Sequence, residues 1–157
     1  MTEQISADVV RSSVTVEGPP ERAFALFTDG ISTWWPLQTH TVGAEPAIAA
    51  IIEPRAGGRW FERAADGSET DWGHVLAWEP PHRVVLSWEI NAEWQPDPTT
   101  ASEVEVSFHT EDGDRTRVEL EHRHLEVFGE QAARMRDDFG SAEGGWTYVM
   151  GRFAGAR

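Results

Sequence analysis

Hydrophobic and polar residues alternate through residues 9–17, and this period of two predicts a β-strand. A Gly-Pro-Pro sequence ends the strand, and its last proline, Pro20, suits the first turn of a helix. Apolar residues then recur at helical spacing through Asp29, and Gly30 predicts the end of that helix. We expect a second, short helix over residues 32–35.

Six more strands are predicted downstream, because runs of alternating or apolar residues are separated by glycine, proline and Asp-Gly turn sequences. They cover residues 47–54, 59–64, 71–79, 83–90, 103–110 and 115–122, and residues 91–100 predict a loop. Two apolar stripes at helical spacing, from Phe128 to Phe139 and from Trp146 to Phe153, predict a C-terminal helical region interrupted at 140–145. Strands in this order with helices on one face predict an antiparallel sheet of the α+β class.

The chain contains a series of short motifs that occur in the same order in a known protein family. These motifs extend over nearly the whole chain. They are Pro-Glu-Arg-Ala-Phe at 20–24, Trp-Trp at 34–35, Glu-Pro-Arg at 53–55, Gly-Gly-Arg-Trp at 57–60, Glu-Pro-Pro at 79–81, Thr-Arg-Val-Glu-Leu-Glu-His at 116–122 and Gly-Trp at 145–146. The chain resembles the START-like, SRPBCC superfamily. Within it, the chain is similar to small standalone bacterial-type members of the branch named for the activator of heat-shock protein 90 ATPase homologue.

This resemblance implies a helix-grip fold, in which a seven-stranded antiparallel sheet wraps around a long C-terminal helix and two short helices follow the first strand. It also implies a cavity between sheet and helix. Members of the superfamily bind apolar small molecules, a few relatives catalyse cyclisation or dehydration, and the branch takes its name from a co-chaperone. We expect residues 1–157 to form a single domain of this kind.

Composition narrows the classes of function. The chain has 157 residues, no cysteine and a net charge of −14. Nucleic acid and anionic membranes are therefore unfavourable partners, and thiolate chemistry and cysteine metal sites are excluded. We find no apolar run long enough to span a membrane and no secretion signal, and we expect a soluble, cytoplasmic protein.

Eight tryptophans are an unusual number for a chain of this length. Each indole offers a large apolar face and one N–H donor. The tryptophans therefore indicate either a bulky core or an aromatic-lined cavity, and core filling is the default reading.

The middle strands carry the candidate chemistry. If the strands alternate strictly, Glu62 shares the inward face of Trp60, and His74 shares that of Trp72, Leu76 and Trp78. His122 points inward from the last strand by the same rule. The functional reading of Glu62 and His74 is a polar anchor, or a general acid–base pair, inside the cavity.

The alternative reading is structural. Glu62 would then be satisfied by an internal partner, or a bulge would turn it outward and Phe61 inward, because a one-residue shift exchanges the faces of a strand. His122 would be a structural histidine at a strand end. No ligand spacing favours a metal site, and we expect neither metal nor cofactor.

A second candidate region follows the short helix. Trp35 is either part of the cavity or a hydrophobic plug between helix and sheet, and His40 either caps a ligand or bonds the loop backbone.

We predict a small-molecule binding domain for an apolar or aromatic ligand, without assigning catalysis. The predicted ligand-binding residues are Trp35, His40, Trp60, Glu62, Trp72, His74, Trp88, Phe108, His122, Trp146 and Met150. The alternatives are a co-chaperone-like module that binds a chaperone, and a cyclase or dehydratase that uses Glu62 and His74. The oligomeric state is open, with a homodimer as the base-rate expectation.

Overall fold

The computed structural model describes residues 9–156 of the chain. The strands are β1 (Val10–Glu17), β2 (Ala47–Ile52), β3 (Arg59–Ala64), β4 (Glu69–Glu79), β5 (Arg83–Trp88), β6 (Ser102–Glu111) and β7 (Arg115–Arg123). The helices are α2 (Pro20–Thr28), α3 (Ala132–Gly140) and α4 (Trp146–Ala154), with short 3₁₀ helices η1 (Ile31–Thr33), η2 (Pro98–Thr100) and η3 (Leu125–Gln131). The predicted order of elements is confirmed, and most of the boundaries differ from the prediction by one or two residues.

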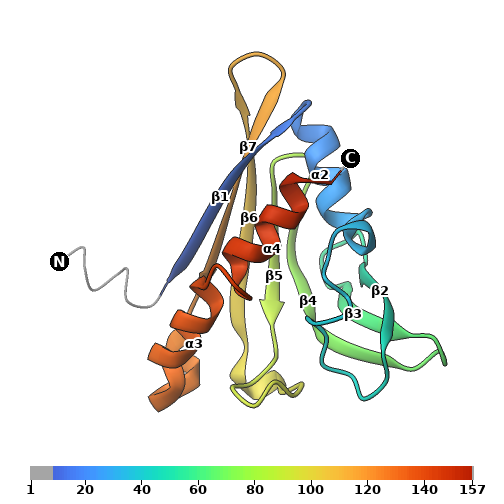
Figure 1. Cartoon of the computed structure of the whole chain (residues 1–157), viewed down its shortest axis with the longest axis vertical. Helices are drawn as coiled ribbons and strands as arrows, with labels where there is room; N and C mark the ends of the chain where they lie inside the picture. The colour runs from blue at the N-terminus through green and yellow to red at the C-terminus, as the bar shows by residue number, and fades with distance from the viewer. Residues whose placement is uncertain (1–8, 157) are drawn as a thin grey trace.

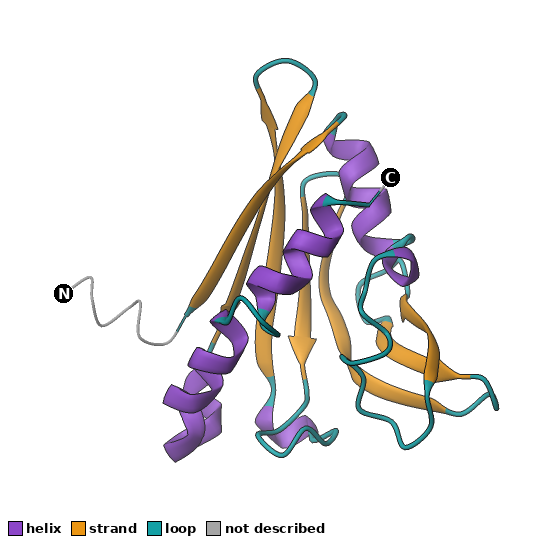
Figure 2. Ribbon diagram, in the orientation of Figure 1, coloured by secondary structure: helices purple, strands orange, loops and turns teal. Residues whose placement is uncertain are grey.

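The seven strands form one antiparallel sheet in the order β1-β7-β6-β5-β4-β3-β2. Figure 1 shows α4 lying across one face of this sheet, with α3 continuing along it toward the start of β1. The three α-helices, α2, α3 and α4, lie on this face of the curled sheet (Figure 2). The expected α+β helix-grip fold is therefore confirmed.

The longest hairpin of the sheet alternates without interruption. On β6 and β7 the inward side chains are buried, and they are Val104, Val106, Phe108, Val118, Leu120 and His122. The outward glutamates pair with arginines on neighbouring strands, as in the contacts of Arg123 with Glu103 and Glu105. Much of the negative charge of the chain therefore lies on the outer face of the sheet, where ion pairs and water stabilise it.

Strand β4 contains two bulges that change which residues face inward. Trp60 pairs with Gly73 while Phe61 pairs with Asp71, so that Trp72 is an extra residue. A second register shift makes Leu76 extra. Gly73 is required at the first bulge, because a Cβ atom there would lie 1.9 Å from the carbonyl oxygen of Ser87.

The C-terminal helix is divided into two nine-residue pieces, α3 and α4. Residues 141–145 join the two pieces, as the glycine-rich sequence predicts, and the single long helix of the family pattern is absent. Gly145 lies so close to the end of α3 that a Cβ atom would be 2.3 Å from the carbonyl oxygen of Phe139. The joint therefore supplies main chain, rather than bulky side chains, to the space beside the sheet.

Two features are absent from the part of the chain that the structure describes. Among residues 9–156, no helix has both the length and the apolar character needed to cross a membrane. Within the same range, no three His, Asp or Glu side chains are grouped so that they could hold a metal ion.

Candidate functional site

A pocket of about 340 Å³ lies between α4, the joint before it, residues 39–42 and the strands β4 and β5. Its wall is mostly aromatic and aliphatic, and consists of Trp35, Thr39, His40, Thr41, Val42, Trp72, Trp88, Ile90, Trp94, Asp138, Phe139, Gly144, Gly145, Trp146 and Val149. Five of the predicted ligand-binding residues are in this set: Trp35, His40, Trp72, Trp88 and Trp146. A second hollow, between α2 and the end of β4, contains none of the predicted residues.

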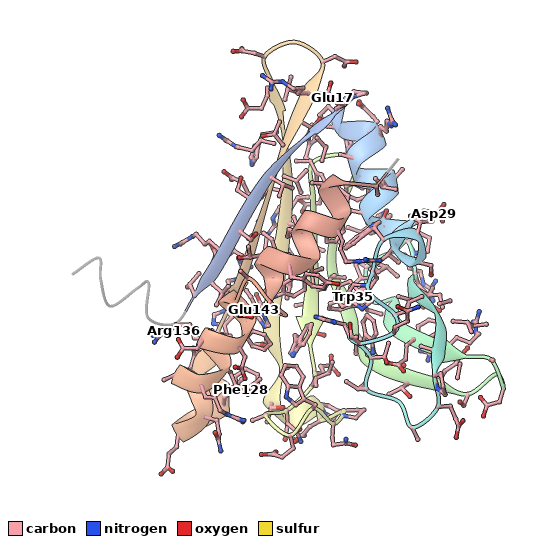
Figure 3. All side chains as sticks on the ribbon, viewed as in Figure 1. Glu17, Asp29, Trp35, Phe128, Arg136 and Glu143 are labelled. Carbon is pink, nitrogen blue, oxygen red and sulfur yellow. The ribbon has the colours of Figure 1, made fainter. Side chains whose placement is uncertain are left out.

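Four tryptophans from different parts of the chain meet in the wall of the pocket. The ring of Trp35 lies 5.1 Å from that of Trp72 and 5.9 Å from that of Trp146, measured between centroids. Trp88 lies 5.7 Å from Trp146, with the rings inclined at 69°. Trp35, labelled in Figure 3, lies between the helices and the strands. The contacts of Trp146 with Trp35 and Trp88 are edge-to-face and fix the orientation of these rings, so the wall is preformed.

Glu62 faces inward from β3 as expected, but it lies behind the wall of the pocket. Its carboxylate accepts hydrogen bonds from the indole N–H of Trp72 at 2.7 Å and from the backbone N–H groups of Val42 at 2.7 Å and Gly43 at 3.0 Å. A Cβ atom at Gly43 would lie 2.7 Å from Oε2 of Glu62. Glu62 is therefore a positioning residue that fixes both a wall tryptophan and the loop that covers the pocket.

The expectation that His74 points into the cavity is wrong. The bulge at Trp72 moves His74 to the outer face of the sheet, where its Nδ1 lies 2.9 Å from Oε2 of Glu89. Its side chain is 44% exposed. Glu62 and His74 consequently face opposite sides of the sheet and do not form an acid–base pair.

His122 faces inward and is fully buried beside Trp146. The indole N–H of Trp146 donates to Nδ1 of His122 at 3.0 Å, so the imidazole proton resides on Nε2 and is donated to Oγ of Ser102 at 2.8 Å. Burial lowers the pKa of His122 to about 3, because the charged ring would be desolvated. The neutral ring holds Trp146 in the wall but does not itself line the pocket.

The other three predicted residues belong to the core rather than to the wall. Trp60 packs behind Trp72 and Trp88, with centroid distances of 5.4 and 5.8 Å. Phe108 contacts two phenylalanines of α2, and Met150 is completely buried. Some of the tryptophans therefore fill the core, as the default interpretation predicted, and others line the pocket, as the alternative predicted.

His40 connects the two sides of the pocket mouth. Its Nε2 lies 2.7 Å from the carbonyl oxygen of Gly144, which can only accept, so Nε2 carries the proton. Its Nδ1 lies 2.7 Å from Oγ1 of Thr39, and its ring stacks on Tyr148. The backbone oxygen of His40 also accepts from the indole of Trp35. The loop over the pocket is thus tied to the joint between α3 and α4.

Trp94 is a pocket residue that pattern reasoning missed, because it lies in the segment predicted only as a loop. Its φ angle is 62°, a left-handed conformation that is rare for a bulky side chain and costs about 1–3 kcal/mol. The side chain is also 41% exposed. The sequence did contain a signal for this contact, because Trp94 stands among polar residues just before Pro96. A large aromatic ring seldom occurs in a solvated loop unless it packs against another part of the protein.

Two indole N–H groups, those of Trp60 and Trp88, are buried and have no hydrogen-bond partner among the described residues. A buried donor without a partner costs about 1–3 kcal/mol. The ring of Trp88 lines the pocket, but its N–H is covered by other atoms of the protein.

The sequence matches one protein family. A family model described as "Activator of Hsp90 ATPase homolog 1-like protein" matches residues 17–156. A comparison with curated proteins gives no match.

Several solved structures share the fold over most of the chain. An anthrahydroquino-γ-pyrone synthase, Txn09, is 36% identical, with a TM-score of 0.63 over 94% of this chain and 95% of that one. The self-sacrificing resistance protein CalC from Micromonospora echinospora is 31% identical, with a TM-score of 0.67 over 94% of this chain and 92% of its own. An HSP90 activator from Plasmodium falciparum is 22% identical, with a TM-score of 0.51 over 74% of this chain and 72% of its own, and this likeness concerns the fold alone.

Proposed function

The chain belongs to the Activator of Hsp90 ATPase homolog 1-like family, and we propose that it is a small-molecule binding domain whose pocket takes a flat, largely apolar aromatic ligand. The observation that carries the proposal is the pocket of about 340 Å³ with five tryptophans in its wall. Its volume lies within the range of about 300–1,000 Å³ that is typical of small-molecule sites, and an apolar wall with few polar groups is their usual chemistry.

The polar groups of the pocket indicate which aromatic ligands fit. The titratable side chains in the wall are His40 and Asp138. A neutral ring system would occupy this wall without burying a charge. The net charge of −14 further disfavours anionic ligands.

Two relatives bear on the proposal, and one of them supports a polycyclic aromatic ligand. The 36% identical protein is named as a synthase of an anthrahydroquino-γ-pyrone, a fused aromatic product. The 31% identical CalC is named as a resistance protein and supports a role for this fold outside chaperone assembly. A chaperone partner for this chain rests on the family description alone and remains a prediction, which a pull-down with the chaperone of the same cell tests.

A thermal-shift screen against acyl, aromatic and polycyclic compounds tests the proposal. A compound present at ten times its Kd should raise the free energy of unfolding by about 1.4 kcal/mol. For a chain of this length, that is a rise in Tm of about 3–6 °C. Polycyclic compounds should produce the largest shifts.

Two variants locate the binding site in the pocket. Thr41→Trp places a large ring in the wall and should abolish the shift, whereas Ile48→Trp, at a 60% exposed position on β2, should leave it intact. A flat response of the wild-type protein across the panel, or equal shifts for both variants, would contradict the proposed function.

Catalysis of ring closure is a second candidate function, favoured by the identity to Txn09 and by the imidazole of His40 in the wall. His40 would have to release Gly144 or Thr39 before it could exchange a proton with a ligand. The test is conversion of an anthrahydroquinone substrate to a γ-pyrone, followed by chromatography. Conversion that is lost in His40→Gln while binding persists would support catalysis, and no conversion by stoichiometric wild-type protein would exclude it for that substrate.

A further inference from the structure

Residues 91–95 form a turn that is built around one side chain. The Oδ1 atom of Asn91 accepts hydrogen bonds from the backbone N–H groups of Glu93 and Gln95, both at 3.0 Å. The main chain closes the turn further, since Trp94 N–H donates to the carbonyl of Asn91 at 2.9 Å and Asn91 N–H donates to that of Gln95 at 2.9 Å. The turn is also tied to α3 by Arg134, which donates to the carbonyl of Ala92 at 3.1 Å.

These contacts hold Trp94 in the left-handed conformation and direct it to the pocket. Bulky residues avoid this backbone region, which glycine or asparagine adopts more readily. A tryptophan at position 94 therefore lowers the stability of the protein, although glycine or asparagine could form the same turn without this cost. Trp94 nevertheless lies in the wall of the pocket with 41% of its surface exposed. Backbone strain of this kind persists only where the surrounding structure holds the residue in place, and such residues are concentrated at functional sites.

The position of Trp94 relative to the inner wall determines how long a ligand must be to contact both. Phe139 contacts Trp88 on the inner wall, at a centroid distance of 5.4 Å, and Trp94 at the mouth, at 6.1 Å. A ligand that touches both tryptophans must therefore extend across the ring of Phe139. We expect a compound of one or two rings to contact the inner wall without reaching Trp94.

We propose that Trp94 is the outer stacking surface of the pocket and a determinant of specificity that selects fused systems of three or more rings over smaller aromatics. The inference rests on the proposed function and names the substrate class of the same site. The exposed face of the indole stacks on the end of the ligand that projects from the pocket. The turn around Asn91 holds that face in place before binding, which lowers the entropy lost on complex formation.

Calorimetric titration with two probes tests this role. The three-ring probe is 1,8-dihydroxyanthraquinone and the two-ring probe is 1-naphthol. Trp94→Ala should weaken binding of the anthraquinone roughly five- to tenfold, because one aromatic contact is lost, and should change binding of the naphthol less than twofold. Leu76→Ala removes an apolar side chain that is 48% exposed, against 41% for Trp94, from the bulge of β4 and should change neither affinity.

Trp94→Gly separates contact from backbone effects. It removes the ring and also relieves the left-handed strain, so it should lose the same anthraquinone affinity as Trp94→Ala while melting at the same or a higher temperature. Wild-type affinity of Trp94→Ala for the anthraquinone, or equal losses for both probes, overturns the role of Trp94 and leaves the proposed function standing. Binding of neither probe to the wild-type protein overturns both.

Discussion

Replacing Glu62 with alanine is expected to lower the free energy of unfolding by about 4 kcal/mol, because three N–H groups lose a charged acceptor and the indole of Trp72 stays buried without a partner. For a chain of this length the corresponding fall in Tm is about 10 °C. The loop over the pocket also loses its attachment to the sheet. The ligand-induced rise in Tm should therefore disappear together with the stability.

Guanidinium unfolding of three variants measures this effect. Glu62→Gln keeps an acceptor oxygen and should be intermediate between wild type and Glu62→Ala. Glu69→Ala is the matched control, since Glu69 lies on the same hairpin with its carboxylate toward solvent and toward arginines, and it should unfold close to wild type. If Glu62→Ala unfolds like the Glu69 variant, the carboxylate does not anchor the loop.

The buried imidazole of His122 should make the protein less stable in acid. Its pKa is lowered from 6.5 to about 3 in the folded state, so the unfolded chain binds a proton below pH 6.5 and the folded chain does not. Stability therefore falls as the pH decreases from about 6.5 toward 3. Between pH 7 and pH 4.5 this one group should cost about 2.5 kcal/mol. The described contacts of the ring are Ser102, Trp88, Phe139 and Trp146, and none of them titrates in this range.

Denaturant unfolding of His122→Gln at both pH values isolates the contribution. Glutamine does not titrate, so this variant should lose about 2.5 kcal/mol less than wild type on acidification, even if it is less stable at pH 7. His82→Gln, at an exposed turn position, should retain the wild-type pH dependence. Equal acid sensitivity of wild type and His122→Gln would show that the unfolding in acid originates elsewhere.

The inward and outward faces of β6 and β7 follow from alternation, because these strands pair in one continuous register. The same rule fails on β4, where two extra residues exchange the faces and turn His74 outward. Gly73 was the warning in the sequence, since a glycine within a strand pattern is typical of a bulge or of a close backbone approach.

The role of Glu62 could be predicted only in part. Its inward direction follows from the position of Trp60 two residues earlier, and a buried carboxylate was expected to find partners. Those partners are main-chain groups about twenty residues away on a loop of irregular conformation, which no local pattern specifies. Trp94 shows the same limit, since its place in the pocket depends on a turn that α3 helps to hold.

The division of the C-terminal helix has a consequence for how proteins with this architecture diversify. Gly144 and Gly145 contribute main chain to the wall of the pocket, and the seven strands are not involved in that part of the wall. Lengthening a connecting segment is thermodynamically inexpensive, at about 0.6 kcal/mol for each doubling. Insertions or deletions in residues 141–145 can therefore enlarge or reduce the pocket while the sheet keeps its sequence, so that the shape of the pocket can change through the length of one connecting segment.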